Sequence, residues 1–228
     1  MPIFRLFILL FITSFCVVHS ENLPTYRMVD LGLFETDSSY AYSINEKGQI
    51  LGTFQENNRS YFFIWDEING IKFIEPPEHH IFSSMMLNNE GQIAGKMLLP
   101  SSNNQTIFYW DINLGFWEIE SGITNCFIYG FNDKGQILGV LNGQIILWDH
   151  GKKINLSSLF YSQIPGEWSS LHSPRLNNFG HVALLAYDQK LEQNRLFIWN
   201  PLGFIIQIQI SVLEKSPLPV RIVGINKY

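Results

Sequence analysis

The side chains best suited to chemistry fall in polar stretches between apolar segments of the sequence. His79 and His80 follow Glu78, and imidazole nitrogens with a carboxylate oxygen are ligands that zinc accepts. Adjacent histidines point to opposite sides of an extended chain, however, and no third ligand is identifiable. We therefore expect an exposed loop at this place, with no metal site and no cofactor.

A second group of reactive or adhesive side chains lies in the long segment 159–174. It contains Tyr161, Trp168 and His172 among small and polar residues. An aromatic ring on a polar loop can stack on a sugar ring or anchor a protein partner. The alternative is that Trp168 folds back over an open sheet edge. Together with the histidine pair, these three residues are the predicted ligand-binding residues.

Carboxylates recur directly after tryptophans, at Asp66, Asp111 and Asp149. A ring of carboxylates around a channel is able to catalyse hydrolysis or elimination. Their strict periodicity favours a structural role instead, as hydrogen-bond acceptors within turns. The sequence also contains no Gly-x-Ser-x-Gly, no His-Glu-x-x-His and no phosphate-binding loop. We predict no catalytic residue.

These candidates are positioned by a segment that occurs four times. Each copy begins with an apolar residue and Asn-x-x-Gly, and an aromatic-rich segment ending in Trp comes after it. The spacing between lead asparagines is 43, 44 and 45 residues, and a fifth copy begins 49 residues later. A period in this range indicates tandem copies of one small structural unit. The repeated positions are Asn45, Gly48 and Trp65; Asn88, Gly91 and Trp110; Asn132, Gly135 and Trp148; Asn177, Gly180 and Trp199.

The repeated residues predict antiparallel strands joined by tight turns. The asparagine side chain can bond the backbone two residues on, and glycine at the fourth position accepts positive φ. This combination closes a hairpin. A further glycine inside the next strand, at Gly52, Gly95 and Gly139, is expected where a bulky side chain lies against the backbone. No stretch beyond residue 20 has the period of a long helix.

Four short strands per repeat predict an all-β, β-propeller-like fold with four four-stranded blades and a C-terminal half-blade. The predicted units cover residues 26–66, 71–111, 116–149 and 153–200, and the half unit covers 204–228. Two alternatives stay open: a four-bladed ring with two extra strands, and a larger propeller that is cut short.

The pattern Asn-x-x-Gly-Gln-Ile-x-Gly, followed by aromatic-x-Trp, resembles the HAF repeat of bacterial extracellular proteins. The resemblance extends from Asp30 to the C-terminus and is specific in the first three units. The fourth unit departs from the pattern, with His181 in place of Gln and Leu184 in place of Gly, which puts its packing in doubt. The resemblance implies a secreted, propeller-like repeat protein.

The N-terminal segment and the composition limit the classes of partner that the protein can have. Arg5 and the apolar run after it predict a signal peptide over residues 1–20, and therefore an exported protein, extracellular, periplasmic or on the cell surface, with no membrane span after cleavage. The alternative is an uncleaved N-terminal anchor. Cys126 is then the only cysteine, and its apolar neighbours predict a buried thiol. The net charge of −5 without a basic block argues against nucleic acid.

Alternation of the strands places the repeated tight turns on one side of the sheets and the irregular loops on the other. The irregular loops are predicted at 75–84, 98–105 and 159–174, and we expect binding there because loops on a rigid scaffold vary most freely. The predicted function is a non-catalytic binding module for a protein or a carbohydrate. The alternatives are a hydrolase or lyase with carboxylates at the central channel, and a truncated remnant without function.

Overall fold

The computed structural model describes residues 38–56, 59–77 and 80–208, together with Met28, Ile222, Gly224 and Ile225. The chain divides into two compact parts, residues 1–32 and residues 33–228. Every strand and helix described lies in the second part. The predicted signal peptide lies outside the described residues. So does His79 of the predicted ligand-binding group.

The described chain forms four antiparallel sheets, each made of four strands that pair in chain order. The first sheet comprises β1 (Ser38–Ile44), β2 (Ile50–Glu56), β3 (Arg59–Asp66) and β4 (Gly70–Ile74), and the second comprises β5 (Ile81–Leu87), β6 (Ile93–Leu98), β7 (Gln105–Asp111) and β8 (Gly115–Ile123). The third comprises β9 (Cys126–Phe131), β10 (Ile137–Leu141), β11 (Gln144–Asp149) and β12 (Lys152–Asn155), and the fourth comprises β13 (Trp168–Leu176), β14 (Val182–Asp188), β15 (Gln193–Trp199) and β16 (Ile205–Ile208). The prediction of an all-β fold with four four-stranded blades is confirmed.

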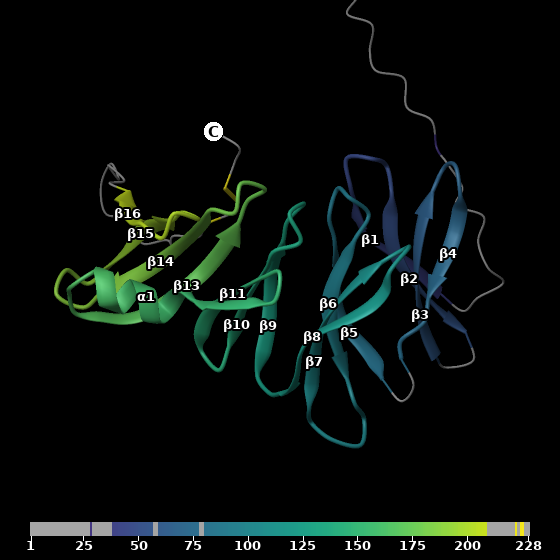
Figure 1. Cartoon of the computed structure of the whole chain (residues 1–228), viewed down its shortest axis with the longest axis horizontal. Coiled ribbons are helices and arrows are strands. Elements are labelled where there is room, and N and C mark those ends of the chain that lie inside the picture. The colour runs from purple at the N-terminus through teal and green to yellow at the C-terminus, as the bar shows by residue number, and fades with distance from the viewer. Residues whose placement is uncertain are drawn as a thin grey trace, which may run out of the picture. The chain divides into compact units, whose positions relative to one another are not determined.

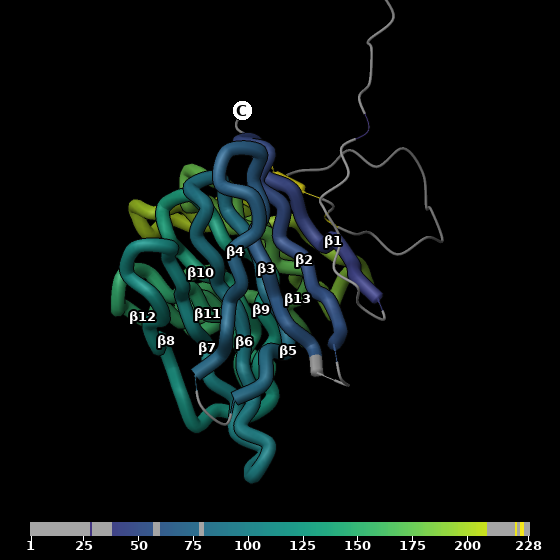
Figure 2. The backbone as a smooth tube through the Cα atoms, turned by 90° about the vertical axis from the view of Figure 1, so that its right-hand side faces the viewer, coloured from purple at the N-terminus to yellow at the C-terminus, as the bar shows by residue number. Residues whose placement is uncertain are grey.

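Successive sheets pack face to face through apolar side chains (Figure 1). One buried cluster joins the first and second sheets, another the second and third, and another the third and fourth. The first strands of neighbouring sheets also contact one another, β1 with β5, β5 with β9, and β9 with β13. Figure 2 looks onto the first sheet, with the others stacked behind it. This is how the blades of a propeller are arranged.

The sheets begin and end one strand later than the predicted units. The repeat pattern assigns residues 71–74 to the start of the second unit, but they form β4 and complete the first sheet. The reason is local: the short turn after Asp66 folds β4 back onto β3, whereas the connection 75–80 crosses to the next sheet. For the same reason β16 completes the fourth sheet and does not start a half-blade. Most of residues 209–228 lie outside the described residues.

The predicted hairpin turns are confirmed in all four repeats. In each turn the glycine N–H donates to the carbonyl oxygen of the lead asparagine, at 3.0 to 3.2 Å. The glycines have φ between +75° and +87°. In each turn the asparagine Oδ1 accepts from the N–H groups two and four residues later, which satisfies turn donors that no strand reaches.

The same asparagines join one sheet to the next. The side-chain amide of Asn45 donates to the carbonyl oxygen of Asn88 at 2.9 Å. Asn88 donates in the same way to Asn132 at 3.0 Å, and Asn132 to Asn177 at 3.0 Å. We call this series the asparagine ladder. It explains why the repeat needs asparagine: an aspartate would satisfy the turn but has no N–H for the neighbouring sheet.

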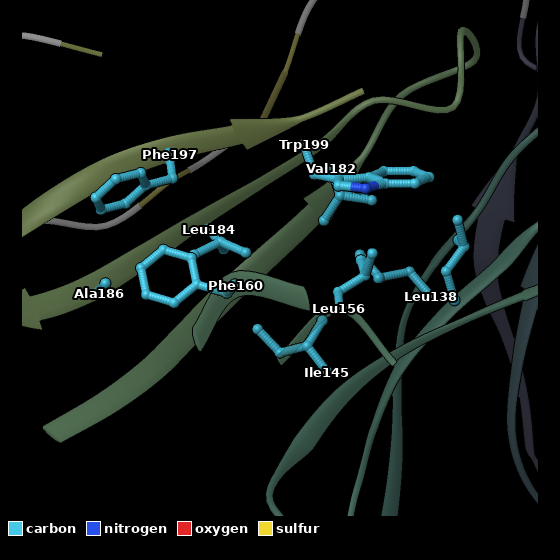
Figure 3. Packing of buried hydrophobic residues seen from close by; sticks show 10 residues of the cluster. Leu138, Ile145, Leu156, Phe160, Val182, Leu184, Ala186, Phe197 and Trp199 are labelled. Carbon is cyan, nitrogen blue, oxygen red and sulfur yellow. The ribbon is translucent and has the colours of Figure 1, made fainter. Parts of the chain in front are cut away.

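The segment 156–167 differs from the predicted irregular loop, because it begins with helix α1 (Leu156–Gln163). Asn155 caps this helix by accepting from the Ser158 N–H at 2.9 Å. Leu156 and Phe160 lie four residues apart on one face of α1 and are almost fully buried. Figure 3 shows both packed between the third and fourth sheets.

Helix α1 also explains how the fourth repeat packs with Leu184 in place of glycine. Leu184 lies opposite Phe197 and is fully buried. The ring of Phe197 packs against Phe160 of α1, with ring centroids 4.9 Å apart, and against Trp168 at 5.4 Å. The Phe197 ring therefore packs on the helix, whereas in the other repeats an aromatic ring packs on a strand glycine. The fourth sheet thus forms despite its departure from the repeat.

Candidate ligand-binding cleft

The structure does not bring the sequence-predicted ligand-binding residues together at one cavity. Trp168 starts β13, packs edge-on against Phe160 and donates from its indole nitrogen to the carbonyl oxygen of Ile164 at 3.2 Å. Trp168 therefore belongs to strand β13 and packs on the apolar cluster between the third and fourth sheets, not over an open sheet edge. Tyr161 is half exposed on α1.

The two histidines of this group that the structure describes are engaged with neighbouring residues of the fold. His172 on β13 bonds Asn194 Oδ1 through Nε2 at 2.9 Å and Ser173 Oγ through Nδ1 at 3.2 Å. His80 lies between β4 and β5, where its backbone N–H donates to the carbonyl oxygen of Pro77. No group of three His, Cys, Asp or Glu side chains able to hold a metal occurs in the described part of the chain. Because His79 lies outside that part, the expectation about a metal there stays a prediction.

Two of the periodic aspartates are turn acceptors, as predicted. Asp66 Oδ1 accepts from the Ile68 and Asn69 N–H groups, and Asp111 Oδ1 accepts from Asn113 and Leu114 in the equivalent turn. Hydrogen bonds from the Asn69 side chain and backbone hold the pKa of Asp66 below its usual value. Asp149 differs, because its carboxylate contacts His150 Nδ1 at 2.6 Å.

A cleft of about 680 Å³ lies between the second and third sheets, on the side that carries the tight turns. Its volume falls within the range of about 300–1,000 Å³ that is usual for small-molecule sites. The residues that line it come from β7, β8, β10 and β11 and from turns of the second and third sheets. They are Gln92, Tyr109, Leu114, Trp117, Glu118, Ile119, Asp133, Lys134, Gly135, Ile137, Trp148, His150 and Gly151. None of the predicted ligand-binding residues is among them, and the side of the sheets is opposite to the predicted one.

Two aromatic side chains of the cleft occupy positions that are not aromatic in the other repeats. Tyr109 on β7 lies opposite Trp117 on β8, so both project from the same face of the second sheet. That face looks toward the third sheet, where the Tyr109 ring meets Phe131 edge-on at 6.2 Å. The equivalent pairs in the other sheets are Ile64 with Lys72, Leu147 with Ile154, and Ile198 with Ile206. The fold therefore does not require aromatic residues at this position.

Trp117 on β8 is 60% exposed. It lies on a fourth strand because the units are displaced by one strand, and the fourth strand is the outer one of its sheet. A large indole surface left in water next to a cavity is costly unless something covers it. The signal was present in the sequence, since Trp117 and Trp168 are the two tryptophans outside the repeated position.

Beside the cleft, a carboxylate of the second sheet contacts the third sheet. The backbone bulge at Ile119 turns Glu120 toward the third sheet. Glu120 accepts from the Trp148 indole nitrogen at 2.6 Å and forms an ion pair with Lys153. Glu118 pairs with Phe108, whose ring packs toward the first sheet, so the Glu118 side chain leaves β8 on the face away from the cleft.

The charged groups at the turns of the cleft are also engaged within the protein. Asp133 accepts from the Asn89 N–H at 2.8 Å, from the Asn89 amide at 3.1 Å and from the Asn178 amide at 2.6 Å. Lys134 donates to the carbonyl oxygen of Phe179 at 2.9 Å. These contacts form a second tier beside the asparagine ladder, and they fix the turn that closes one end of the cleft.

The third turn is more open than the second and fourth turns. A methyl group added at Gly91 would lie 2.7 Å from Gln49 Oε1, and one at Gly180 would lie 2.8 Å from Gln136 Oε1. At Gly135 the nearest atom is His150 Nε2, at 3.9 Å, and at Gly48 of the first turn nothing lies within 4 Å. The space that a glutamine side chain fills in the second and fourth turns is therefore available beside Gly135 in the cleft.

Cys126 is almost fully buried, which confirms the predicted buried thiol. Burial raises the pKa of its thiol to about 11. At pH 8 only roughly one thiol in a thousand is then ionised, and the thiolate is the reactive form. We expect the folded protein to resist a thiol-specific chromogenic disulfide at pH 8, and the same protein in denaturant to react fully. Rapid labelling of the folded protein would contradict this burial.

Among the described residues, no helix is both long and apolar enough to span a bilayer. The one helix described, α1, is 8 residues long.

No model of a known protein family matches the chain, and no curated protein matches it either, so the HAF resemblance stays a prediction. The solved structures that are similar to it include an oligogalacturonate lyase and a dipeptidyl peptidase. Oligogalacturonate lyase in complex with manganese aligns with a TM-score of 0.53 and 8% identity, over 69% of this chain and 49% of the lyase. Dipeptidyl peptidase 4 of Porphyromonas gingivalis aligns with a TM-score of 0.49 and 12% identity, over 76% of this chain and 28% of the peptidase. The chain thus spans half or less of these proteins, and the likeness concerns the fold alone, which is β-propeller-like.

Proposed function

We propose that this protein is a non-catalytic carbohydrate-binding module, and that the cleft between the second and third sheets is its ligand site. The observation that carries the proposal is the exposed Trp117 ring beside Tyr109 at a cavity of about 680 Å³. A flat aromatic face suits the apolar face of a sugar ring, and nearby polar atoms bond its hydroxyl groups.

A binding role is favoured over hydrolysis or elimination by the distribution of carboxylates. The first strands β1, β5, β9 and β13 contact one another and would line a central channel, yet they contain no Asp or Glu. At the cleft, Asp133 and Glu120 are already bonded to protein donors. A general acid or base needs a carboxyl group within reach of the substrate.

Replacing the exposed indole gives the direct test. We expect Trp117→Ala to weaken binding to oligosaccharides captured on a glycan array by at least tenfold, because a buried tryptophan contact commonly contributes about 2 kcal/mol or more. Isothermal titration with the best oligosaccharide of the array measures the loss. Phe204→Ala is the matched control, since this aromatic is 62% exposed on the fourth sheet and does not line the cleft.

Three results would count against the proposal. Equal affinity of the wild type and Trp117→Ala would exclude the cleft as the ligand site. Retention of protein partners alone, with no oligosaccharide bound, would favour the protein-binding alternative. Shortened products after incubation of the bound oligosaccharide would contradict the non-catalytic part.

A further inference from the structure

We propose that the ligand of the cleft is an uncharged oligosaccharide, which the site selects against uronic acid and amino sugar chains. This inference rests on the proposed function and narrows it to one chemical class. Its basis is the state of the ionisable groups around the cleft. Asp133 at the cleft, and Glu120 and Asp149 beside it, are engaged with donors of the protein. Glu118 also lines the cleft, but its strand position places its side chain on the opposite face of β8.

The acidic groups offer no anchor for an ammonium group. Glu120 is paired with Lys153 and bonded to the Trp148 indole. Asp133 receives three hydrogen bonds from the second and fourth sheets, at 2.6 to 3.1 Å. An amino sugar would have to displace one of these donors, and breaking a partly buried charge pair costs more than a new exposed pair returns.

The Asp149 carboxylate is engaged as well. Burial alone would raise the pKa of Asp149, but hydrogen bonds from His150 and Gln136 and the charges of His150 and Lys152 outweigh burial and lower it. Its ionised form is therefore already stabilised from within the protein. This carboxylate therefore needs no further hydrogen-bond donor from a cationic ligand.

The basic groups at the cleft cannot bind a carboxylate through two parallel hydrogen bonds. Arginine, the side chain that binds carboxylates with two parallel hydrogen bonds, is not among the residues lining the cleft. Lys134 is the one lysine that lines it, and its ammonium already donates to Phe179 of the fourth sheet. A uronic acid chain would bring one negative charge per ring against Asp133 with no free cation to balance it.

Three polar atoms of the cleft are left for a ligand. The Tyr109 hydroxyl and the Trp117 indole nitrogen make no hydrogen bond to another described residue. The third is His150 Nε2, because the Asp149 carboxylate contacts the other ring nitrogen, Nδ1, while Nε2 lies near Gly135. One aromatic face and these three polar atoms match the apolar face and the hydroxyl groups of a neutral pyranose.

The experiment compares oligosaccharides of similar length and different charge. Cellohexaose, xylohexaose and mannohexaose are neutral, hexagalacturonate is anionic, and the chitosan hexamer is cationic. By isothermal titration of the full chain, we expect one neutral hexamer to bind at least tenfold more tightly than either charged hexamer. Its affinity should change less than twofold between about 0.05 M and about 0.5 M salt, because screening acts on charged contacts only. Trp117→Ala should weaken it at least tenfold, and Trp117→Phe, which keeps a ring, should restore part of the affinity.

The outcomes separate this inference from the proposed function. Tighter binding of hexagalacturonate or the chitosan hexamer, still lost in Trp117→Ala, would overturn the inference and leave a carbohydrate site in the cleft. Binding of a neutral hexamer that is insensitive to Trp117→Ala would overturn both. No binding of any of the five hexamers, with the protein shown to be folded, would also overturn both.

Discussion

Asn132→Ala is expected to lower the free energy of unfolding by about 3 kcal/mol, a large fraction of the stability of an ordinary domain. The side chain is 2% exposed. It donates to Gln136 at 2.7 Å and to the Asn177 carbonyl at 3.0 Å, and it accepts from the Lys134 and Gln136 N–H groups. Alanine leaves these buried partners without a bond, and each such loss costs about 1–3 kcal/mol before relaxation.

Urea unfolding followed by tryptophan fluorescence measures this loss as a shift of the midpoint to lower urea. Asn45→Ala is the matched control, because Asn45 makes the same kind of contacts from a more exposed position at the start of the asparagine ladder. We expect it to cost about 1 kcal/mol. Asn132→Asp separates the two roles of the residue, since aspartate keeps the turn acceptor and loses the donor to the next sheet. A wild-type midpoint for Asn132→Ala would show that the ladder is not a source of stability, and equal losses in Asn132→Ala and Asn45→Ala would contradict the role of burial.

Gly95→Ala is expected to cost about 2–3 kcal/mol, although the change adds a single methyl group. A Cβ at this position would lie 2.3 Å from the Ser84 carbonyl oxygen and 2.8 Å from Cζ of the Phe108 ring. The backbone of Gly95 has no positive φ that would penalise alanine, so the cost arises from the close approach alone. The main chain of β5 or the ring must move.

The same denaturation measurement tests this prediction. Gly224→Ala is the control, because nothing lies within 4 Å of the added methyl group, and its effect should stay within about 0.5 kcal/mol. The double variant Gly95→Ala with Phe108→Leu should lose less stability than the sum of the two single variants, since the smaller side chain relieves one of the two contacts. Additive losses would place the strain at Ser84 alone.

The sequence predicted the strands and turns because their causes lie within a few residues. The asparagine acceptor and the left-handed glycine act over five positions, as at Asn88 and Gly91, and they fix the hairpin wherever the rest of the chain lies. The prediction that the glycine inside the second strand lies against a bulky side chain was also correct. The rings are Phe63 at Gly52, Phe108 at Gly95 and Trp148 at Gly139.

The grouping of strands into sheets was wrong by one strand, because periodicity defines the length of a unit and not its starting point. Any four consecutive strands satisfy the same repeat. The choice is made by pairing, and the short turn between Asp66 and Gly70 makes β4 the partner of β3. The start of helix α1 was missed because its apolar residues face the gap between two sheets, and only their packing reveals that gap.

What the sequence by itself determined is therefore the strands and their tight turns, the number of repeats and the buried state of Cys126. Only the tertiary structure decided where a ligand can bind. The cleft is lined by residues from two sheets, brought together when the second and third sheets face each other. Tyr109 and Trp117 meet through strand pairing, and His150 reaches Gly135 across a turn of the same sheet. A cavity between sheets depends on side chains that fail to fill the interface, and that failure appears only after the sheets have packed.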